Sequence, residues 1–126
     1  MTTIGTTVTV NRTVTEKHTA KYVGSGSLDV FATPMMIALM EEAACGCLAN
    51  SLESGQTSVG TLINVSHSAA SPVGAVISAT ATIDEVDGRK VSFTVTAHDG
   101  VNEIGSGKHE RFIVDGERFM KKLEQR

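Results

Sequence analysis

The feature of this sequence that most constrains its fold is one apolar stretch over residues 32–48. It carries only two charges, on the adjacent Glu41 and Glu42. At about 100° per residue, its apolar side chains cover one face of a helix and much of the remaining surface. A helix that is hydrophobic nearly all round belongs in a protein core, so the rest of the chain has to wrap it.

The start of this helix is marked by Thr33-Pro34. The Thr33 side chain suits the N-cap position, and Pro34 as the first helical residue has no amide hydrogen to lose. The helical pattern continues to about Leu52, after which Ser54-Gly55 ends it.

Length and composition indicate one ordinary globular domain over residues 1–126. The hydrophobic content is 40% and the charged content 20%, which is typical of folded proteins. A net charge of -3 gives no attraction to nucleic acid. The two glutamates interrupt the longest apolar run, which excludes a membrane-spanning helix, and the first residues lack a leader pattern. We therefore expect a cytoplasmic protein with no nucleic-acid or membrane partner.

The two cysteines, Cys45 and Cys47, lie two positions apart on the predicted helix and point about 200° away from each other. They are poorly placed to bridge or to chelate. We expect both to be reduced, small core residues, and we expect no metal site.

Alternating apolar and polar residues predict strands on both sides of the helix. One covers residues 6–15, and the four after the helix are bounded by turn signals and cover residues 57–69, 75–86, 90–98 and 102–114. Their spacing suits an antiparallel meander, and residues 117–125 favour a short terminal helix. The order predicts an α+β fold, an antiparallel five- to six-stranded sheet wrapped around one long buried helix.

This order of elements is similar to the hotdog fold, and specific motifs resemble one branch of it. Phe31-Ala32-Thr33-Pro34, Glu41 and the later Val65-Ser66-His67 resemble the fluoroacetyl-CoA thioesterase-like family. The resemblance implies thioester hydrolysis in which Thr33, Glu41 and His67 act together. It also implies a homodimer or higher oligomer with active sites at the subunit interface, and no cofactor, because coenzyme A enters with the acyl-CoA substrate.

The chain departs from this family in the loop before the helix. The enzyme specialised for the fluorinated substrate has bulky aromatic residues there, whereas residues 24–28 of this chain read Gly-Ser-Gly-Ser-Leu. We therefore expect a general short-acyl thioesterase, with Tyr22 or Phe31 as the aromatic residues near the acyl group.

Glu41 is the candidate general base or nucleophile. It lies at the margin of the apolar helix face, where partial desolvation would raise the basicity of a carboxylate. A surface carboxylate at a helix edge is the alternative, and Glu42 is the rival position.

His67 is the candidate proton carrier. It shares a strand face with Ile63 and Val65, which points it toward the helix. The alternative is a core histidine satisfied by a backbone carbonyl. We expect the other three histidines, His18, His98 and His109, to face solvent.

Backbone amides are the candidate substrate-binding groups. The free amides of Met35 and Met36 in the first helical turn, and that of Gly60, are candidates to hold a carbonyl oxygen. Thr33 would orient substrate or water.

Eight helical positions separate Thr33 from Glu41, a span of about 12 Å. Since these side chains of one chain cannot touch, a site composed from two subunits is expected. Two alternatives to a thioesterase stay open at this point: a noncatalytic acyl-CoA or small-molecule binding module on the same fold, and a hotdog dehydratase.

Overall fold

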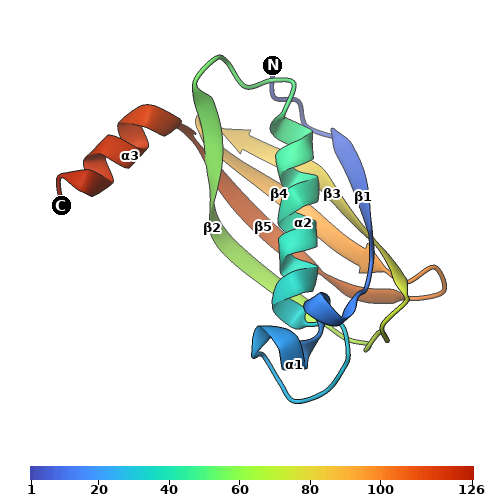
Figure 1. Ribbon diagram of the computed structural model, residues 1–126. Coiled ribbons are helices and arrows are strands. Elements are labelled where there is room, and N and C mark those ends of the chain that lie inside the picture. The colour runs from blue at the N-terminus through green and yellow to red at the C-terminus, as the bar shows by residue number, and fades with distance from the viewer.

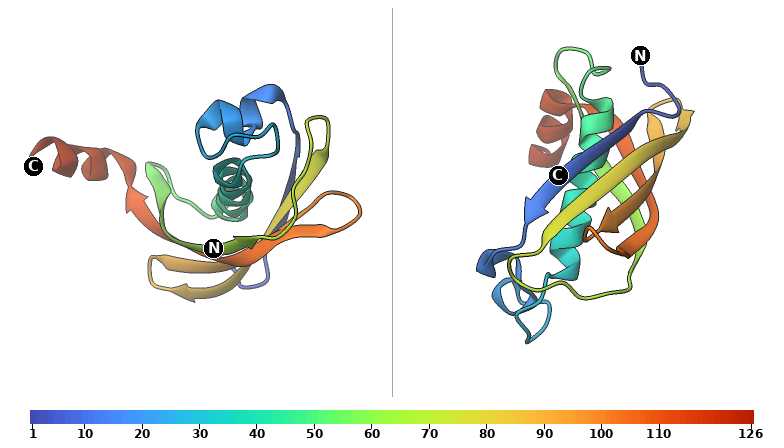
Figure 2. Two further views of the ribbon diagram at one scale, coloured as in Figure 1. Left: turned by 90° about the horizontal axis from the view of Figure 1, so that it is seen from below. Right: turned by 90° about the vertical axis from the view of Figure 1, so that its right-hand side faces the viewer.

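A computed structural model describes all of residues 1–126 and confirms the α+β architecture. One five-stranded antiparallel sheet contains β1 (Thr7–Thr13), β2 (Gln56–His67), β3 (Val76–Asp87), β4 (Lys90–His98) and β5 (Glu103–Asp115). The sheet curves around the long helix α2 (Thr33–Leu48), as Figures 1 and 2 show. The 3-10 helix η1 (Glu16–His18) and the short α1 (Ala20–Val23) precede it.

The core lies between α2 and the concave face of the sheet. Met36, Met40 and Leu48 of α2 are fully buried. On the sheet side, alternate residues of β3 and β4 are buried while their neighbours are not, which is the inside-outside pattern of a sheet packed on one face. The sheet therefore covers one side of α2, whereas Ala38, Glu42 and Cys45 on the other side are exposed, so the helix is not buried all round as its composition predicts.

Both ends of α2 differ from the prediction. Ala32 is the N-cap, with extended backbone, and Thr33 and Pro34 are the first two helical residues. The Thr33 hydroxyl is hydrogen-bonded to His67 instead of capping the helix. At the other end α2 stops at Leu48, because the Ser51 hydroxyl and amide both bond to the Leu48 carbonyl, at 3.0 and 2.9 Å, and form a turn.

The strand order also differs from a simple meander. The sheet order is β1-β3-β4-β5-β2, so only β3, β4 and β5 pair in chain order. The connection after β2 carries the chain past the start of α2, where Val30 bridges Pro72. As a result β2 lies at one edge of the sheet and pairs with β5, and β1 lies at the other edge beside β3.

The two cysteines are both free, but only one fits the prediction. Cys47 is buried and its thiol donates to the Ala81 carbonyl at 3.3 Å, and burial raises the pKa of this thiol. Cys45 is exposed, because it lies on the side of α2 that the sheet does not cover.

The last helix, α3 (Gly116–Glu124), extends away from the sheet (Figures 1 and 2). The Asp115 side chain caps it by accepting from the Arg118 amide at 3.0 Å. None of the helices has the length and apolar character that crossing a membrane requires.

Candidate active site

Backbone hydrogen bonds fix the residues that lead into α2. The Phe31 amide donates to the Ser71 carbonyl at 2.9 Å, and the Ala32 amide donates to the His18 carbonyl at 2.9 Å. The segment before the helix is thus held between η1 on one side and the β2–β3 connection on the other. This sets the position of Thr33 at the first turn.

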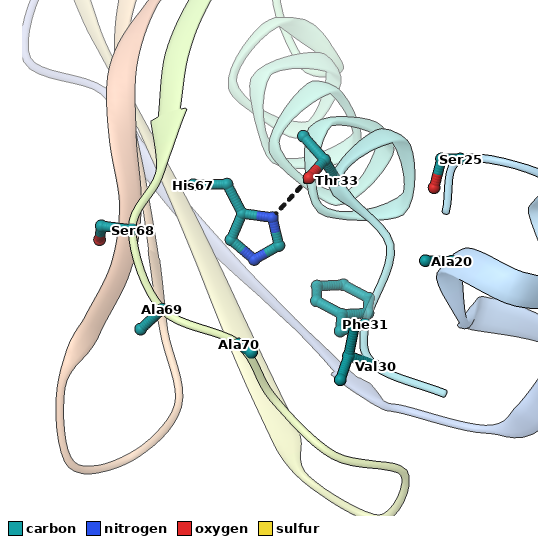
Figure 3. Close-up of a pocket in the computed structure, with 9 residues that line it drawn as sticks. All are labelled: Ala20, Ser25, Val30, Phe31, Thr33, His67, Ser68, Ala69 and Ala70. Carbon is teal, nitrogen blue, oxygen red and sulfur yellow. Dashed lines mark hydrogen bonds between the residues drawn. The ribbon is translucent and has the colours of Figure 1, made fainter. Parts of the chain in front are cut away.

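Thr33 and His67 form a hydrogen-bonded pair at the start of α2. Thr33 Oγ1 lies 2.7 Å from His67 Nδ1, and Figure 3 shows the hydroxyl pointing at the imidazole from the first turn of the helix. The Phe31 ring packs edge-on to the imidazole, with centroids 6.5 Å apart and planes at 80°. The strand face predicted for His67 is therefore the face that meets the helix.

The second nitrogen of His67 has no partner. Nε2 is buried and makes no hydrogen bond, which is uncommon for a buried polar atom. Burial lowers the pKa of His67, and the Ala69 backbone opposes this shift in part. The imidazole is therefore neutral near pH 7, and Nε2 is available to a ligand.

A pocket of about 270 Å³ opens beside this pair. Thr33, His67 and Phe31 contribute to its wall, and the other lining residues are small or aliphatic: Ala20, Ser25, Val30, Ser68, Ala69 and Ala70 (Figure 3). Tyr22 is 61% exposed and is not part of the wall. Of the two expected aromatic residues, only Phe31 lies at the pocket.

Glu41 lies two turns further along α2 and has a different set of neighbours. Its carboxylate oxygen Oε2 is 3.3 Å from Arg111 Nη1, and the side chain is 39% exposed. Glu42, its rival, pairs with Arg12 at 2.8 Å, and both of those side chains are about half exposed. The Glu41 carboxylate is thus paired with a buried cation, whereas the Glu42 carboxylate belongs to an ion pair at the surface.

Arg111 is a functional candidate that the sequence did not single out. It is 7% exposed, and the Ser58 hydroxyl and carbonyl accept from its Nε and Nη2 at 2.8 and 3.1 Å. Its cross-strand partner is Gly60. In the sequence it is one of several scattered basic residues, and nothing local marks it as buried.

His109 corrects the prediction that it faces solvent. It is 1% exposed and stacks on Phe93, with centroids 5.8 Å apart. His109 and Arg111 lie two positions apart on β5, so their side chains share one face of the strand and both point into the molecule. The position of β5 between β4 and β2 explains this burial, and the sequence pattern of residues 102–114 did not resolve that face.

Gly60 lies directly against the Glu41 carboxylate. A Cβ at this position would be 2.8 Å from Glu41 Oε2 and 3.3 Å from Arg111 Nη1. A shift in pairing follows at once, between Gly60 and Leu62, and such bulges re-aim the backbone beside active sites. A larger residue at this position would therefore force the Glu41 carboxylate to move.

The amides of Met35 and Met36 are not free, contrary to expectation. Both donate to the Ala32 carbonyl at 3.0 Å. The Met36 side chain is fully buried and lies against Gly105, so its contribution is to packing at the start of α2.

The chain therefore holds two separate polar groups of residues along α2. The first is Thr33 with His67, and the second is Glu41 with Arg111, Gly60 and His109. Eight helical positions, about 12 Å, lie between their helical members. No hydrogen bond joins the two groups within the chain.

Comparison with known proteins gives a consistent assignment. The FlK family, described as fluoroacetyl-CoA-specific thioesterase, matches residues 14–117. A fluoroacetyl-CoA thioesterase from Streptantibioticus cattleyicolor is 48% identical over 98 residues, which cover 78% of this chain and 70% of that protein.

Solved structures agree. A structure of the fluoroacetyl-CoA thioesterase FlK superposes with a TM-score of 0.93 at 39% identity, covering 98% of this chain and 96% of that chain. A hot-dog-like protein from Thermanaerovibrio acidaminovorans, at 24% identity, has a TM-score of 0.87 and covers 97% of this chain and 90% of that one, which supports the fold. The chain therefore belongs to the FlK thioesterase family, and it is an acyl-CoA thioesterase with the hotdog fold.

Proposed function

We propose that this protein hydrolyses short-chain acyl-CoA thioesters with Glu41 as base or nucleophile, His67 as proton carrier and Thr33 as the group that orients substrate or water. The observation that carries this proposal is that His67, in the wall of the pocket, has a buried Nε2 without a partner while its Nδ1 is hydrogen-bonded to Thr33. A neutral imidazole in this position accepts or donates a proton near neutral pH.

The pocket supports a short acyl group that is not restricted to fluoroacetyl. Small residues such as Ala20, Ser25 and Ala69 line it, and the preceding loop contributes no large side chain. We propose that fluoroacetyl-CoA is one substrate among several short acyl-CoA thioesters, in contrast to the specificity in the name of the family.

The chemical step requires a water oxygen, or a carboxylate oxygen, to reach the thioester carbonyl carbon. In the first route Glu41 takes a proton from water as the water oxygen attacks, and the carbon–sulfur bond breaks. The neutral imidazole of His67 then relays this proton from Glu41 to the departing thiolate, so both residues return to their starting forms. In the second route the Glu41 carboxylate attacks, CoA leaves, and water then opens the mixed anhydride. Both routes yield one free acid and one CoA thiol for each water consumed.

Since Glu41 and His67 of one chain belong to separate groups, we propose that a homodimer completes the site. The 12-residue strand β2 is an unpaired edge, and Leu62 and Ile63 on it are 45% and 39% exposed. Unpaired edges of this length favour pairing with a second chain. Such pairing would bring Glu41 of one subunit near the Thr33–His67 pair of the other.

Release of free thiol from a panel of acetyl-, fluoroacetyl-, propionyl- and butyryl-CoA tests the proposed activity. We expect Glu41→Gln to lower kcat by about 100-fold or more, because the lost carboxylate is the base or nucleophile. Glu42→Gln is the matched control and should keep wild-type rates. Full activity of the Glu41→Gln variant would remove its proposed role, and hydrolysis of fluoroacetyl-CoA alone would contradict the broader substrate range.

A single turnover in ¹⁸O-water separates the two routes. Label in the Glu41 carboxyl group indicates the anhydride route, and label confined to the product acid indicates the general-base route.

A further inference from the structure

His109 is the one fully buried histidine of the chain, and the catalytic roles proposed above leave it unused. It lies on β5, is 1% exposed, and does not line the pocket beside His67. Both of its nitrogens are nevertheless engaged. Nδ1 is 2.7 Å from the Leu62 carbonyl, and Nε2 is 3.2 Å from Arg111 Nη1.

These two partners fix the protonation of the ring. A guanidinium N–H can only donate, so His109 Nε2 must accept and carries no proton. A carbonyl can only accept, so Nδ1 must carry the proton and donate to Leu62. An imidazolium would lose the bond from Arg111 and place two cations 3.2 Å apart. Burial, the largest cause, lowers the pKa of His109, which agrees with the neutral form.

The bond from Arg111 to His109 shares its donor nitrogen with Glu41. Nη1 lies 3.2 Å from His109 Nε2 and 3.3 Å from Glu41 Oε2, whereas the other two guanidinium nitrogens bond to Ser58. Since the guanidinium is planar and rigid, these contacts together determine where Nη1 points. His109 Nε2 is therefore the second acceptor at Nη1, beside the carboxylate.

His109 also holds the backbone that approaches Glu41. Leu62 is the first residue after the shift in pairing that follows Gly60, and the Nδ1 bond fixes its carbonyl. A Cβ placed on Gly60 would be 3.4 Å from His109 Cε1 and 2.8 Å from Glu41 Oε2. One ring therefore contacts both the cation and the strand segment that border the carboxylate.

We infer that His109 is a positioning residue, whose Nε2 lone pair orients the Arg111 guanidinium so that Nη1 holds the Glu41 carboxylate in its reactive position. The inference rests on the role proposed for Glu41. The ring itself does not line the pocket beside His67.

Two isosteric variants separate the contacts of the ring. His109→Gln keeps an acceptor near the Nε2 position, and His109→Asn keeps a donor near the Nδ1 position. We expect His109→Asn to lower kcat about tenfold with little change in KM, because Arg111 loses its acceptor. We expect His109→Gln to recover most of that loss. His98→Gln, at an exposed histidine, is the control.

Equal losses in both variants, or wild-type kcat in a folded His109→Asn protein, would overturn the inference. A loss that appears in KM with kcat unchanged would do the same.

A spectroscopic readout keeps the inference testable without any activity. ¹⁵N NMR of the wild-type histidine rings at pH 7 should show one ring as the neutral tautomer protonated at Nδ1, lost in His109→Gln. If the signals that disappear in His109→Gln belong to a ring protonated at Nε2 or at both nitrogens, the inference is contradicted. An inactive wild-type protein with the expected tautomer would instead contradict the proposed function.

Discussion

The two polar groups along α2 differ in how completely their hydrogen bonds are satisfied. At the start of the helix, His67 has one partner, Thr33, and its other nitrogen is unpaired. Two turns later, Arg111 has four contacts to three residues. An unpaired buried nitrogen is costly unless a ligand completes it, whereas a saturated network rigidifies its members.

This difference indicates that the two groups have different roles. The Thr33–His67 group opens to a pocket and is arranged to receive a ligand, and the Arg111 group is arranged to hold one carboxylate still. A preorganised carboxylate lowers the reorganisation that the reaction requires. The contrast predicts that substitutions in the first group act directly on proton transfer, and that those in the second act through the position of Glu41.

The largest expected effect on activity comes from substitutions in the Thr33–His67 group. His67→Ala should lower kcat by about 100-fold or more, since general acid–base catalysis contributes about 10² to 10⁴. Thr33→Val, which removes only the hydroxyl bond to Nδ1, should lower it about tenfold. Steady-state thiol release measures both. Equal and small losses would show that His67 is a packing residue of the core.

A smaller effect on activity is expected when a larger side chain is placed against the Arg111 group. Gly60→Ala places a methyl group 2.8 Å from Glu41 Oε2, so the carboxylate must move, and we expect a loss of about tenfold in kcat/KM. Gly116→Ala is the matched control, because its new Cβ would meet neighbours only at 3.6 Å. Wild-type kinetics of Gly60→Ala would contradict the claim that the Arg111 group acts through the position of Glu41.

The smallest effect is on stability at acid pH. Burial lowers the pKa values of His67 and His109 in the folded state. Below the ordinary histidine pKa of about 6.5, the unfolded chain therefore binds more protons than the folded protein. Stability is therefore full above about pH 6.5 and decreases as the pH falls toward the folded-state pKa values. Thermal unfolding between pH 7.5 and 5 should show this decrease, and His67→Gln should make it shallower. An unchanged slope in that variant would contradict the assignment.

The sequence predicts the elements better than their arrangement. The alternation in β4 and the apolar character of α2 mark local structure directly, and the predicted strand over residues 90–98 is the observed one. The position of β2 beside β5 depends on long-range pairing, which no local pattern records.

The same limit applies to the site. The motifs pointed to Thr33, Glu41 and His67, and the chain indeed holds Thr33 against His67. Arg111 and His109 were missed because their burial depends on β5 having a strand on both sides. The prediction of free amides at Met35 and Met36 was wrong, because Ala32, not Thr33, is the N-cap and its carbonyl accepts from both amides.

The central claim, that Glu41 of one subunit serves His67 of the other, is tested most directly in heterodimers purified through two different tags. A heterodimer of a Glu41→Gln chain with a His67→Ala chain has one complete site if the sites are shared, and should have about half the wild-type activity. A wild-type chain paired with a chain carrying both substitutions then has no complete site and should be nearly inactive. The opposite result, an inactive first heterodimer and a half-active second one, would place each site within a single chain and contradict the account.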